Sequence, residues 1–332
     1  MSDKWKTVRG LINTHVQLLS KPNRLNSRSS RTFSLTSNKN MKFVQFSYSS
    51  CPTDVRAGFL VGDDVVDINQ VDCSIPKTMI DILKEGVANK VISCIGNSSP
   101  RVPLSSVHLK PPIHGVDKIL CVALNYADHC KEQNLAIPKI PIIFNKFPST
   151  IIGPNGHLRI RTEICKQVDW EVELAVIIGK KTSGVVHAAE ANDFIFGYTI
   201  AQDITGRDWQ KEKNGGQFLL GKSQDTFCPI GPCIVTEDEI GDAHNLNIKC
   251  SVNGVQKQSS NTGQIIHKIP SIIERLTTVM TLLPGDIILT GTPGGVGVHR
   301  SPQEFLKPGD VVTSEIQKIG KLEFTVVNNS FL

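Results

Sequence analysis

The sequence lacks the features that mark membrane-spanning, disulfide-bonded and nucleotide-binding proteins. No apolar run approaches the roughly 18 residues that a membrane-spanning helix needs. The nine cysteines are odd in number and form no Cys-x-x-Cys pair, so we expect free thiols in a reducing compartment rather than disulfides or structural zinc. The glycine-rich stretch Thr290–Gly297 has no Gly-x-x-x-x-Gly-Lys-Ser/Thr motif, which argues against a phosphate loop. Its backbone amides and the Thr292 hydroxyl still suit a small carboxylate or oxyanion.

Acidic residues are scarce at the start of the chain and balanced by basic ones elsewhere. Residues 1–40 hold eight Lys or Arg and a single acid, whereas the remainder holds 28 basic and 30 acidic residues. The net charge of +5 for the 332 residues therefore comes from the N-terminal segment, and the rest carries −2. Because residues 41–332 are slightly acidic overall, their charge does not favour a nucleic-acid partner. The 39% hydrophobic and 20% charged content is typical of a soluble globular protein, and we expect no membrane partner.

The N-terminal segment, residues 1–40, has the composition of a mitochondrial transit peptide. It is rich in Arg, Ser and Asn and almost free of acid. The stretch Arg31–Ser34 resembles a processing site with cleavage after Phe33. We therefore expect a matrix protein. The alternative is a disordered basic tail without an address, and translation from Met41 would give a cytosolic form.

Alternating and turn-bounded segments predict a mainly β protein of the α+β class in two parts. Residues 41–112 are expected to form a small β-rich module, because Lys42–Tyr48 alternates as a strand and Ala57–Ile68 reads as a hairpin. The Pro- and Ser-rich stretch Ser98–Pro112 ends this module. Residues 113–332 then form the larger catalytic domain.

The stretch Val168–Gly179 predicts a strand with two acids on one face. Side chains two residues apart in a strand point the same way, so Glu171 and Glu173 project together while Trp170 faces the core. Two like charges this close favour a bound cation such as Mg²⁺ or Ca²⁺. The alternative is a solvated strand face. Asp203, at the end of another predicted strand and near a glycine, is well placed to complete a metal site.

Other polar residues follow strands or occupy helical turns. His129 and Glu132 are three apart in a predicted helical turn, the arrangement of a general base and its orienting carboxylate, although a surface His–Glu pair fits equally. Arg207 suits a substrate carboxylate, unless it pairs with Asp208 or Asp203. Further candidates are Gln210, one helical turn on, and two lysines that follow apolar runs, Lys146 and Lys222; the alternative for Lys222 is a solvated side chain.

Five motifs agree in order and spacing with those of one known family. They are Asn125-Tyr126-x-x-His129-x-x-Glu132, Trp170-Glu171-Val-Glu173-Leu, Asp203-x-x-x-Arg207-Asp208-x-Gln210, Gly221-Lys222-Ser223 and Leu289-Thr290-Gly291-Thr292-Pro293. Over about residues 41–330 the chain resembles the fumarylacetoacetate hydrolase superfamily, and most closely a mitochondrial branch of it. Gly206 and Gln224 depart from the residues that relatives often carry.

The resemblance implies a fold, a metal and a reaction class. It implies a rolled mixed β-sheet, usually in homodimers, and Mg²⁺, or Mn²⁺ in some members, held by Glu171, Glu173 and Asp203. It places His129 and Glu132 on a lid, Lys222 at the substrate and Thr292 near the substrate carboxylate. Arg207, Gln210 and Lys146 complete the expected substrate contacts. The substrates implied are small 2-oxo acids, and the branch points to oxaloacetate tautomerase.

Three activities remain open from the sequence. A cation that stabilises an enolate serves keto–enol tautomerisation, C–C bond hydrolysis of acylpyruvates and oxaloacetate decarboxylation alike. The residues do not choose between the tautomerase and the other two reactions. A hypothesis from another class is a metal-binding protein without turnover, and the intact set of carboxylates, dyad and lysine argues against it.

Overall fold

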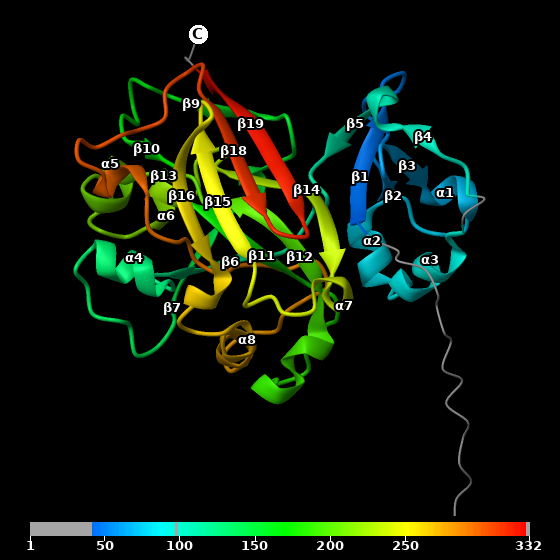
Figure 1. Ribbon diagram of the computed structural model, residues 1–332. Helices are drawn as coiled ribbons and strands as arrows, with labels where there is room; N and C mark the ends of the chain where they lie inside the picture. Colours follow the sequence, from blue (N-terminus) through cyan, green and yellow to red (C-terminus); the bar gives the residue numbers. More distant parts are fainter. Residues whose placement is uncertain (1–41, 97–98, 330–332) are drawn as a thin grey trace, which may run out of the picture. The chain divides into compact units, whose positions relative to one another are not determined.

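A computed structural model describes residues 42–96 and 99–329 of the chain (Figure 1). The predicted transit peptide and Met41 lie outside the described residues. Within them strands dominate and helices are short, so the predicted mainly β, α+β fold class is confirmed. All nine cysteines are free thiols, as expected. No helix of the described part is long and apolar enough to cross a bilayer.

A mixed sheet of 12 strands is the larger framework, in the order β4-β3-β2-β1-β14-β12-β11-β17-β6-β7, with β5 on β1 and β8 on β14. Its strands are β1 (Lys42–Tyr48), β2 (Arg56–Val61), β3 (Asp64–Asp67), β4 (Val102–Pro103), β5 (Val107–Lys110), β6 (Ile119–Ala123), β7 (Ile142–Lys146), β8 (Ile151–Ile152), β11 (Val172–Ile178), β12 (Ile195–Gln202), β14 (Cys228–Thr236) and β17 (Ile287–Leu289). Because β1 pairs with β14, the first strands of the chain extend this sheet. The boundary at residue 112 stays a prediction.

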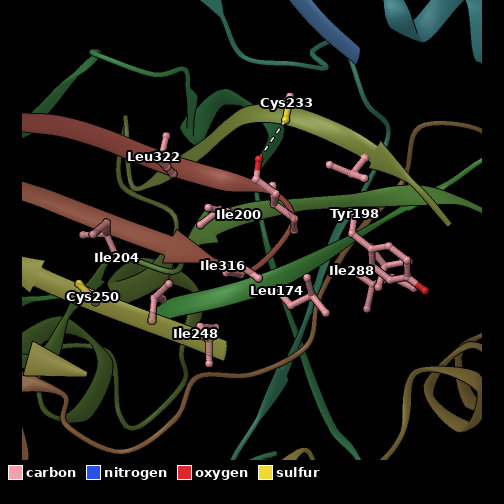
Figure 2. Close-up of a cluster of buried hydrophobic side chains, with 14 of the residues drawn as sticks. Leu174, Tyr198, Ile200, Ile204, Cys233, Ile248, Cys250, Ile288, Ile316 and Leu322 are labelled. Atoms are coloured by element: carbon pink, nitrogen blue, oxygen red, sulfur yellow. Dashed lines mark hydrogen bonds between the residues drawn. The ribbon is translucent and has the colours of Figure 1, made fainter. Parts of the chain in front are cut away.

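A second sheet of five strands packs on the first. Its order is β16-β15-β18-β19-β9, formed by β9 (His157–Ile160), β15 (Asn247–Val252), β16 (Val255–Asn261), β18 (Val311–Ile316) and β19 (Gly320–Asn328). A tight turn at Asn253-Gly254 joins β15 to β16 in an antiparallel pair. Figure 2 shows apolar side chains from both sheets meeting, among them Leu174 and Ile200 from the first and Ile316 from the second.

The helices are short and lie outside the sheets. They are α1 (Ile68–Val71), α2 (Met79–Lys84), α3 (Ala88–Cys94), α4 (Ala127–Glu132), α5 (Arg207–Lys211), α6 (Leu219–Lys222), α7 (Glu237–Ile240) and α8 (Ile269–Thr277). In the described part of the chain the 3₁₀ turns are η1 (Leu104–Ser106), η2 (Pro148–Thr150), η3 (Ala188–Phe194), η4 (Thr262–Gln264) and η5 (Gly297–His299). A second buried cluster packs α2 and α3 against the outer face of the large sheet, where Phe43, Ile80 and Ile287 contribute.

The predicted strand Val168–Gly179 is interrupted at its acidic end. A short pair of strands, β10 (Val168–Asp169) and β13 (Thr205–Gly206), precedes the regular pairing of β11 with β12. Trp170 and Glu171 lie in the gap between β10 and β11. The Glu171 amide donates to Gln202 Oε1 at 2.9 Å and the Val172 amide to Gln258 Oε1 at 3.0 Å. Side-chain acceptors thus satisfy buried backbone groups that the interrupted ladder leaves unpaired.

Candidate active site

Three carboxylates from neighbouring segments of the large sheet meet at one point. Glu171 and Glu173 flank the start of β11, and Asp203 directly follows β12, where its amide donates to Glu171 O at 2.9 Å. Each offers an oxygen, and these atoms all lie within 4.8 Å of one another. The three residues are 5%, 2% and 0% exposed. The structure thus brings together the residues that the sequence predicts as metal ligands.

Burial and neighbouring charges shift the pKa values of two carboxyls of this cluster in opposite directions. Burial, together with the negative charges of Asp203 and Glu171, raises the pKa of Glu173 well above its ordinary value. Burial would raise the pKa of Glu171 too, but the charges of Lys222 and Arg207 lower it to about 2. One carboxyl of the three therefore lacks a matching cation, which is the situation that a divalent metal ion relieves.

Lys222 and Lys146 approach the carboxylates from two directions. Lys222 Nζ lies 2.8 Å from Glu171 Oε2 and 2.5 Å from Asp203 Oδ2. Lys146 Nζ donates to Asp203 Oδ1 at 2.7 Å and to Ile204 O at 3.0 Å. Lys222, which ends the short helix α6, is only 2% exposed, unlike the solvated lysine considered as its alternative.

Arg207 pairs with acids other than the two considered from the sequence. Its Nε donates to Asp169 Oδ2 at 2.9 Å and its Nη2 lies 2.6 Å from Glu171 Oε1. Nη1 donates to Gln210 Oε1 at 3.1 Å. Both Asp169 and Glu171 raise the pKa of this guanidinium against the effect of burial. Arg207 is therefore engaged by the protein itself, through contacts between distant segments that sequence spacing does not reveal.

The dyad predicted at the start of the larger domain is formed. His129 Nδ1 lies 3.0 Å from Glu132 Oε2 within α4. Gln133 Nε2 lies 2.8 Å from His129 Nε2; since the amide nitrogen donates, the neutral ring carries its proton on Nδ1 and offers Nε2 as an acceptor. Burial raises the pKa of Glu132, but hydrogen bonds from His129 and the Gly295 amide outweigh it and lower the pKa.

Backbone amides of the glycine-rich stretch donate hydrogen bonds to the protein's own carboxylates. The amides of Gly291, Gly295 and Gly297 donate to Glu173 Oε2 at 2.7 Å, Glu132 Oε1 at 2.8 Å and Asp169 Oδ1 at 2.6 Å. Gly295 has a φ of +103° and a Cβ there would meet the Lys257 carbonyl, so only glycine fits. The expectation of amides free for a ligand is corrected at these three positions.

A small cavity of about 170 Å³ lies over the carboxylates. Of the predicted residues it is lined by His129, Glu171, Glu173, Asp203, Arg207, Gln210, Lys222 and Thr292. Glu132 and Lys146 lie behind this lining, Glu132 on His129 and Lys146 on Asp203. The volume is below the 300 Å³ or more that drug-sized ligands need, which suits a ligand of a few carbon atoms.

Several lining residues were missed by the sequence reasoning. They are Val122, Ala123, Leu124, Gln133, Phe144, Lys211, Phe218 and His299. Lys211 follows Gln210 directly and belongs to the same short helix, so its position was a usable signal. His299 lies in η5, far along the chain, and no local pattern marks it. The Phe144 ring lies 5.1 Å from Lys222 Nζ, centroid to nitrogen, and forms the apolar wall.

Comparison with known proteins places this site in a family. Residues 118–327 match the family described as fumarylacetoacetate (FAA) hydrolase, C-terminal. The chain belongs to the fumarylacetoacetate hydrolase family. The matched range contains all ten predicted site residues, and the resemblance inferred from five motifs is confirmed.

Members of the family with curated names are similar over most of the chain. It is 46% identical over 291 residues to "Oxaloacetate tautomerase fahd2, mitochondrial" of Xenopus laevis, covering 86% of this chain and 90% of that protein. It is also 46% identical over 268 residues to "Oxaloacetate tautomerase FAHD2A, mitochondrial" of Homo sapiens, covering 80% and 85%. The mitochondrial branch favoured by the sequence is thus the one that these relatives represent.

Solved structures of the family share the fold. A fumarylacetoacetate hydrolase from psychrophilic Exiguobacterium antarcticum is 34% identical with a TM-score of 0.76, covering 87% of this chain and 100% of that one. A maleylpyruvate hydrolase from Sphingobium sp. SYK-6, in complex with manganese(II) ion and pyruvate, is 30% identical with a TM-score of 0.72, covering 87% and 100%. The second structure shows that a family member holds a divalent metal and a 2-oxo acid together.

Proposed function

We propose that this chain is a magnesium-dependent oxaloacetate tautomerase that converts the enol form of oxaloacetate to the keto form. The observation that carries the proposal is the buried cluster of Glu171, Glu173 and Asp203 beneath a small cavity that also presents His129 and Lys222. The names of relatives at 46% identity support the choice of reaction.

The three carboxylates fit a divalent cation by their chemistry. They are hard oxygen donors at convergent positions, and the charge of Glu173 is not matched by a cation of the protein. Such donor sets suit Mg²⁺, with Mn²⁺ and Ca²⁺ as alternatives. When bound, the cation supplies Lewis acidity that stabilises negative charge on an oxygen next to a carboxylate.

The chain's own residues hold the protons that the reaction moves. Tautomerisation removes one proton from the enol oxygen and delivers one to carbon. His129 Nε2 is the unprotonated ring nitrogen, because Nδ1 donates to Glu132, and it takes the enol proton when its hydrogen bond from Gln133 Nε2 opens. Lys222 is a donor, since Asp203 and Glu171 raise its pKa in spite of burial. Both groups line the same cavity, so one acceptor and one donor face a single substrate.

The remaining predicted residues act on this machinery in different ways. We propose that Arg207 fixes Glu171 and orients the Gln210 amide toward the cavity. The Thr292 hydroxyl donates its one proton to Val172 O at 3.0 Å and accepts from Gln258 Nε2 at 2.8 Å, so we propose that Thr292 shapes the cavity wall and does not donate to the substrate carboxylate. Lys146 does not line the cavity, and we propose that it positions Asp203.

A spectroscopic assay separates this reaction from its rivals. The purified enzyme is mixed with freshly dissolved enol-oxaloacetate, and the ultraviolet absorbance of the enol is followed alongside pyruvate. The proposal expects rapid loss of the enol signal without pyruvate, abolition by EDTA and recovery with Mg²⁺. Appearance of pyruvate would instead assign a decarboxylase, cleavage of an acylpyruvate a C–C hydrolase, and no turnover of any of these a metal-binding protein.

We also propose a mitochondrial location. The relatives are named mitochondrial, and the acid-poor composition of residues 1–40 supports a presequence. Fusing these residues to a fluorescent protein should direct it to the matrix, and deleting residues 1–33 from the full chain should leave it in the cytosol. Unchanged location after the deletion would contradict this.

A homodimer is proposed from exposed apolar side chains at one edge of the large sheet. Ile137, Ile140 and Ile142, at 56%, 59% and 43% exposure, lie in the segment that leads into the edge strand β7 or on that strand. Exposed apolar groups in series favour a protein contact. Sedimentation should give twice the mass of the processed chain, and Ile140→Glu should yield monomers; a native monomer would contradict the proposal.

A further inference from the structure

Most cationic groups at the cavity are already paired with acids of the protein. Arg207 is held by Asp169 and Glu171, and Lys222 by Glu171 and Asp203. A cation engaged by two buried carboxylates is a poor partner for a third, because the attraction that it offers is already used. The substrate's second carboxylate therefore needs another partner.

Two cavity residues have no such engagement. Lys211 ends α5 and His299 ends η5, and both line the cavity and are exposed toward solvent. Within residues 42–96 and 99–329, neither side chain forms a hydrogen bond or an ion pair. The His299 ring lies 6.1 Å from that of His129, centroid to centroid, so His299 borders directly on the proposed base.

Burial and neighbouring cations lower the pKa of both residues. Burial and the charge of Arg207 lower the pKa of Lys211. Burial, followed by the charges of Lys211, His129 and Arg207, lowers the pKa of His299. The charge of Lys211 thus disfavours a second positive charge on His299, and an anion placed beside both groups relieves that repulsion.

The formal charge of the lining supports a doubly charged ligand. With neutral histidines, the three lining carboxylates balance three lining cations, Arg207, Lys211 and Lys222. A divalent metal then leaves +2, which a dicarboxylate neutralises and a monocarboxylate does not. Charge complementarity of this kind gives specificity as well as affinity.

We propose that Lys211 and His299 bind the substrate carboxylate that lies farther from Glu171, Glu173 and Asp203, and so select 2-oxo diacids over 2-oxo monoacids. The inference rests on the proposed function, since it assigns the outer half of the same substrate. Lys211 supplies the charge, and His299 supplies a ring N–H that donates to a carboxylate oxygen. Neither residue takes part in the proton transfers of the tautomerisation.

A substrate pair that differs only in the outer charge tests the assignment. The enzyme is assayed with enol-oxaloacetate and with its 4-methyl ester, whose outer group is neutral. Lys211→Met should raise KM for oxaloacetate so that kcat/KM falls about 10- to 100-fold, the scale of one lost charged hydrogen bond, with kcat nearly kept. The ester should be unaffected, and Lys211→Arg should restore most of the loss. His299→Leu should give a smaller loss of the same pattern, and His299→Gln, which keeps a donor, less still.

Binding without turnover separates this inference from the proposed function. In the magnesium-loaded native protein, calorimetry should show tighter binding of malate than of lactate, which share the 2-hydroxy acid group but differ in the outer carboxylate. Lys211→Met should remove this preference and leave the affinity for oxalate unchanged. Lys181→Met, at an exposed lysine that does not line the cavity, is the matched control and should change nothing.

Equal losses on oxaloacetate and its ester, or an intact malate preference in Lys211→Met, would overturn the assignment. If native enzyme fails to act on enol-oxaloacetate, the proposed function falls, while the malate and lactate comparison still decides whether the outer carboxylate is bound here.

Discussion

At the floor of the cavity (Glu171, Glu173, Asp203 and Lys222) no residue is more than 5% exposed; Lys222 pairs with Glu171 and Asp203, and Glu173 accepts a hydrogen bond from the Gly291 amide. At its rim (Lys211 and His299) both side chains are exposed and lack such partners within the described residues. Buried charges must be paired to be tolerated, whereas exposed ones are tolerated without partners. Residues of the floor must therefore suit both the stability of the fold and the chemistry, whereas residues of the rim need only suit the ligand.

The strongest test of the floor is removal of one carboxylate charge without change of shape. Glu173→Gln keeps an oxygen that accepts from the Gly291 amide but loses a metal ligand. We expect activity and Mg²⁺ binding to fall together by more than about 100-fold, since even outer-shell changes at metal sites reach that size. Activity assays and calorimetry with Mg²⁺ measure the two losses.

The matched control is Glu315→Gln in β18, where a partly exposed glutamate pairs with Lys249. It should leave both quantities unchanged. Full turnover of Glu173→Gln would show that Glu173 is not a ligand.

A lysine behind the floor should matter for stability as well as activity. The Lys146–Asp203 pair is fully buried, so Lys146→Met leaves part of the Asp203 charge unmatched. We expect a loss of about 3 kcal/mol in the free energy of unfolding, at the lower end for broken buried pairs because Lys222 remains. Denaturant unfolding measures it.

The exposed lysine Lys321, paired with Glu323, is the comparison residue for that experiment. Lys321→Met should cost under about 1 kcal/mol. A loss of the same size in both variants would contradict the special position of Lys146.

Metal removal should expose the cost of crowding at the floor. The folded-state pKa of Glu173 is raised above the value of about 4.3 for an unfolded chain. A group shifted upward contributes its stability fully below the unfolded pKa and loses it as pH rises through the folded pKa. In EDTA, Glu173→Gln should therefore have a higher Tm than the native protein, with a gap that widens as pH rises.

With Mg²⁺ present the difference in Tm should vanish or change sign, because the ion binds the native protein, which keeps all three carboxylates, and not Glu173→Gln. A gap independent of pH and of metal would mean that the charge of Glu173 is not what destabilises the metal-free protein.

The smallest expected effect concerns stability at the rim. Lys211→Met removes a side chain without a hydrogen bond or ion pair to the described residues, so the free energy of unfolding should change by no more than about 0.5 kcal/mol. The same variant is expected to lose affinity for dicarboxylates. A clear drop in Tm would show that Lys211 has a structural role and would blur the distinction between floor and rim.

Local periodicity was enough to predict the pairing of Glu171 with Glu173 and the dyad. Glu171 and Glu173 share a face because strand side chains alternate, and His129 meets Glu132 because residues three apart meet on a helix. The interruption of the strand at Trp170 and the pairing of Arg207 with Asp169 and Glu171 could not be predicted in this way, because they depend on contacts between segments distant in sequence. The same holds for His299 and for the glycine amides that bind acids, since neither carries a local signal.

The most direct test of the metal centre is anomalous diffraction from crystals soaked with Mn²⁺ and oxalate, an enolate mimic. The account predicts one strong peak bounded by oxygens of Glu171, Glu173 and Asp203, with Lys222 Nζ displaced from its contact with Asp203 Oδ2. A peak elsewhere, or no peak with Lys222 still bridging Glu171 and Asp203, would contradict it.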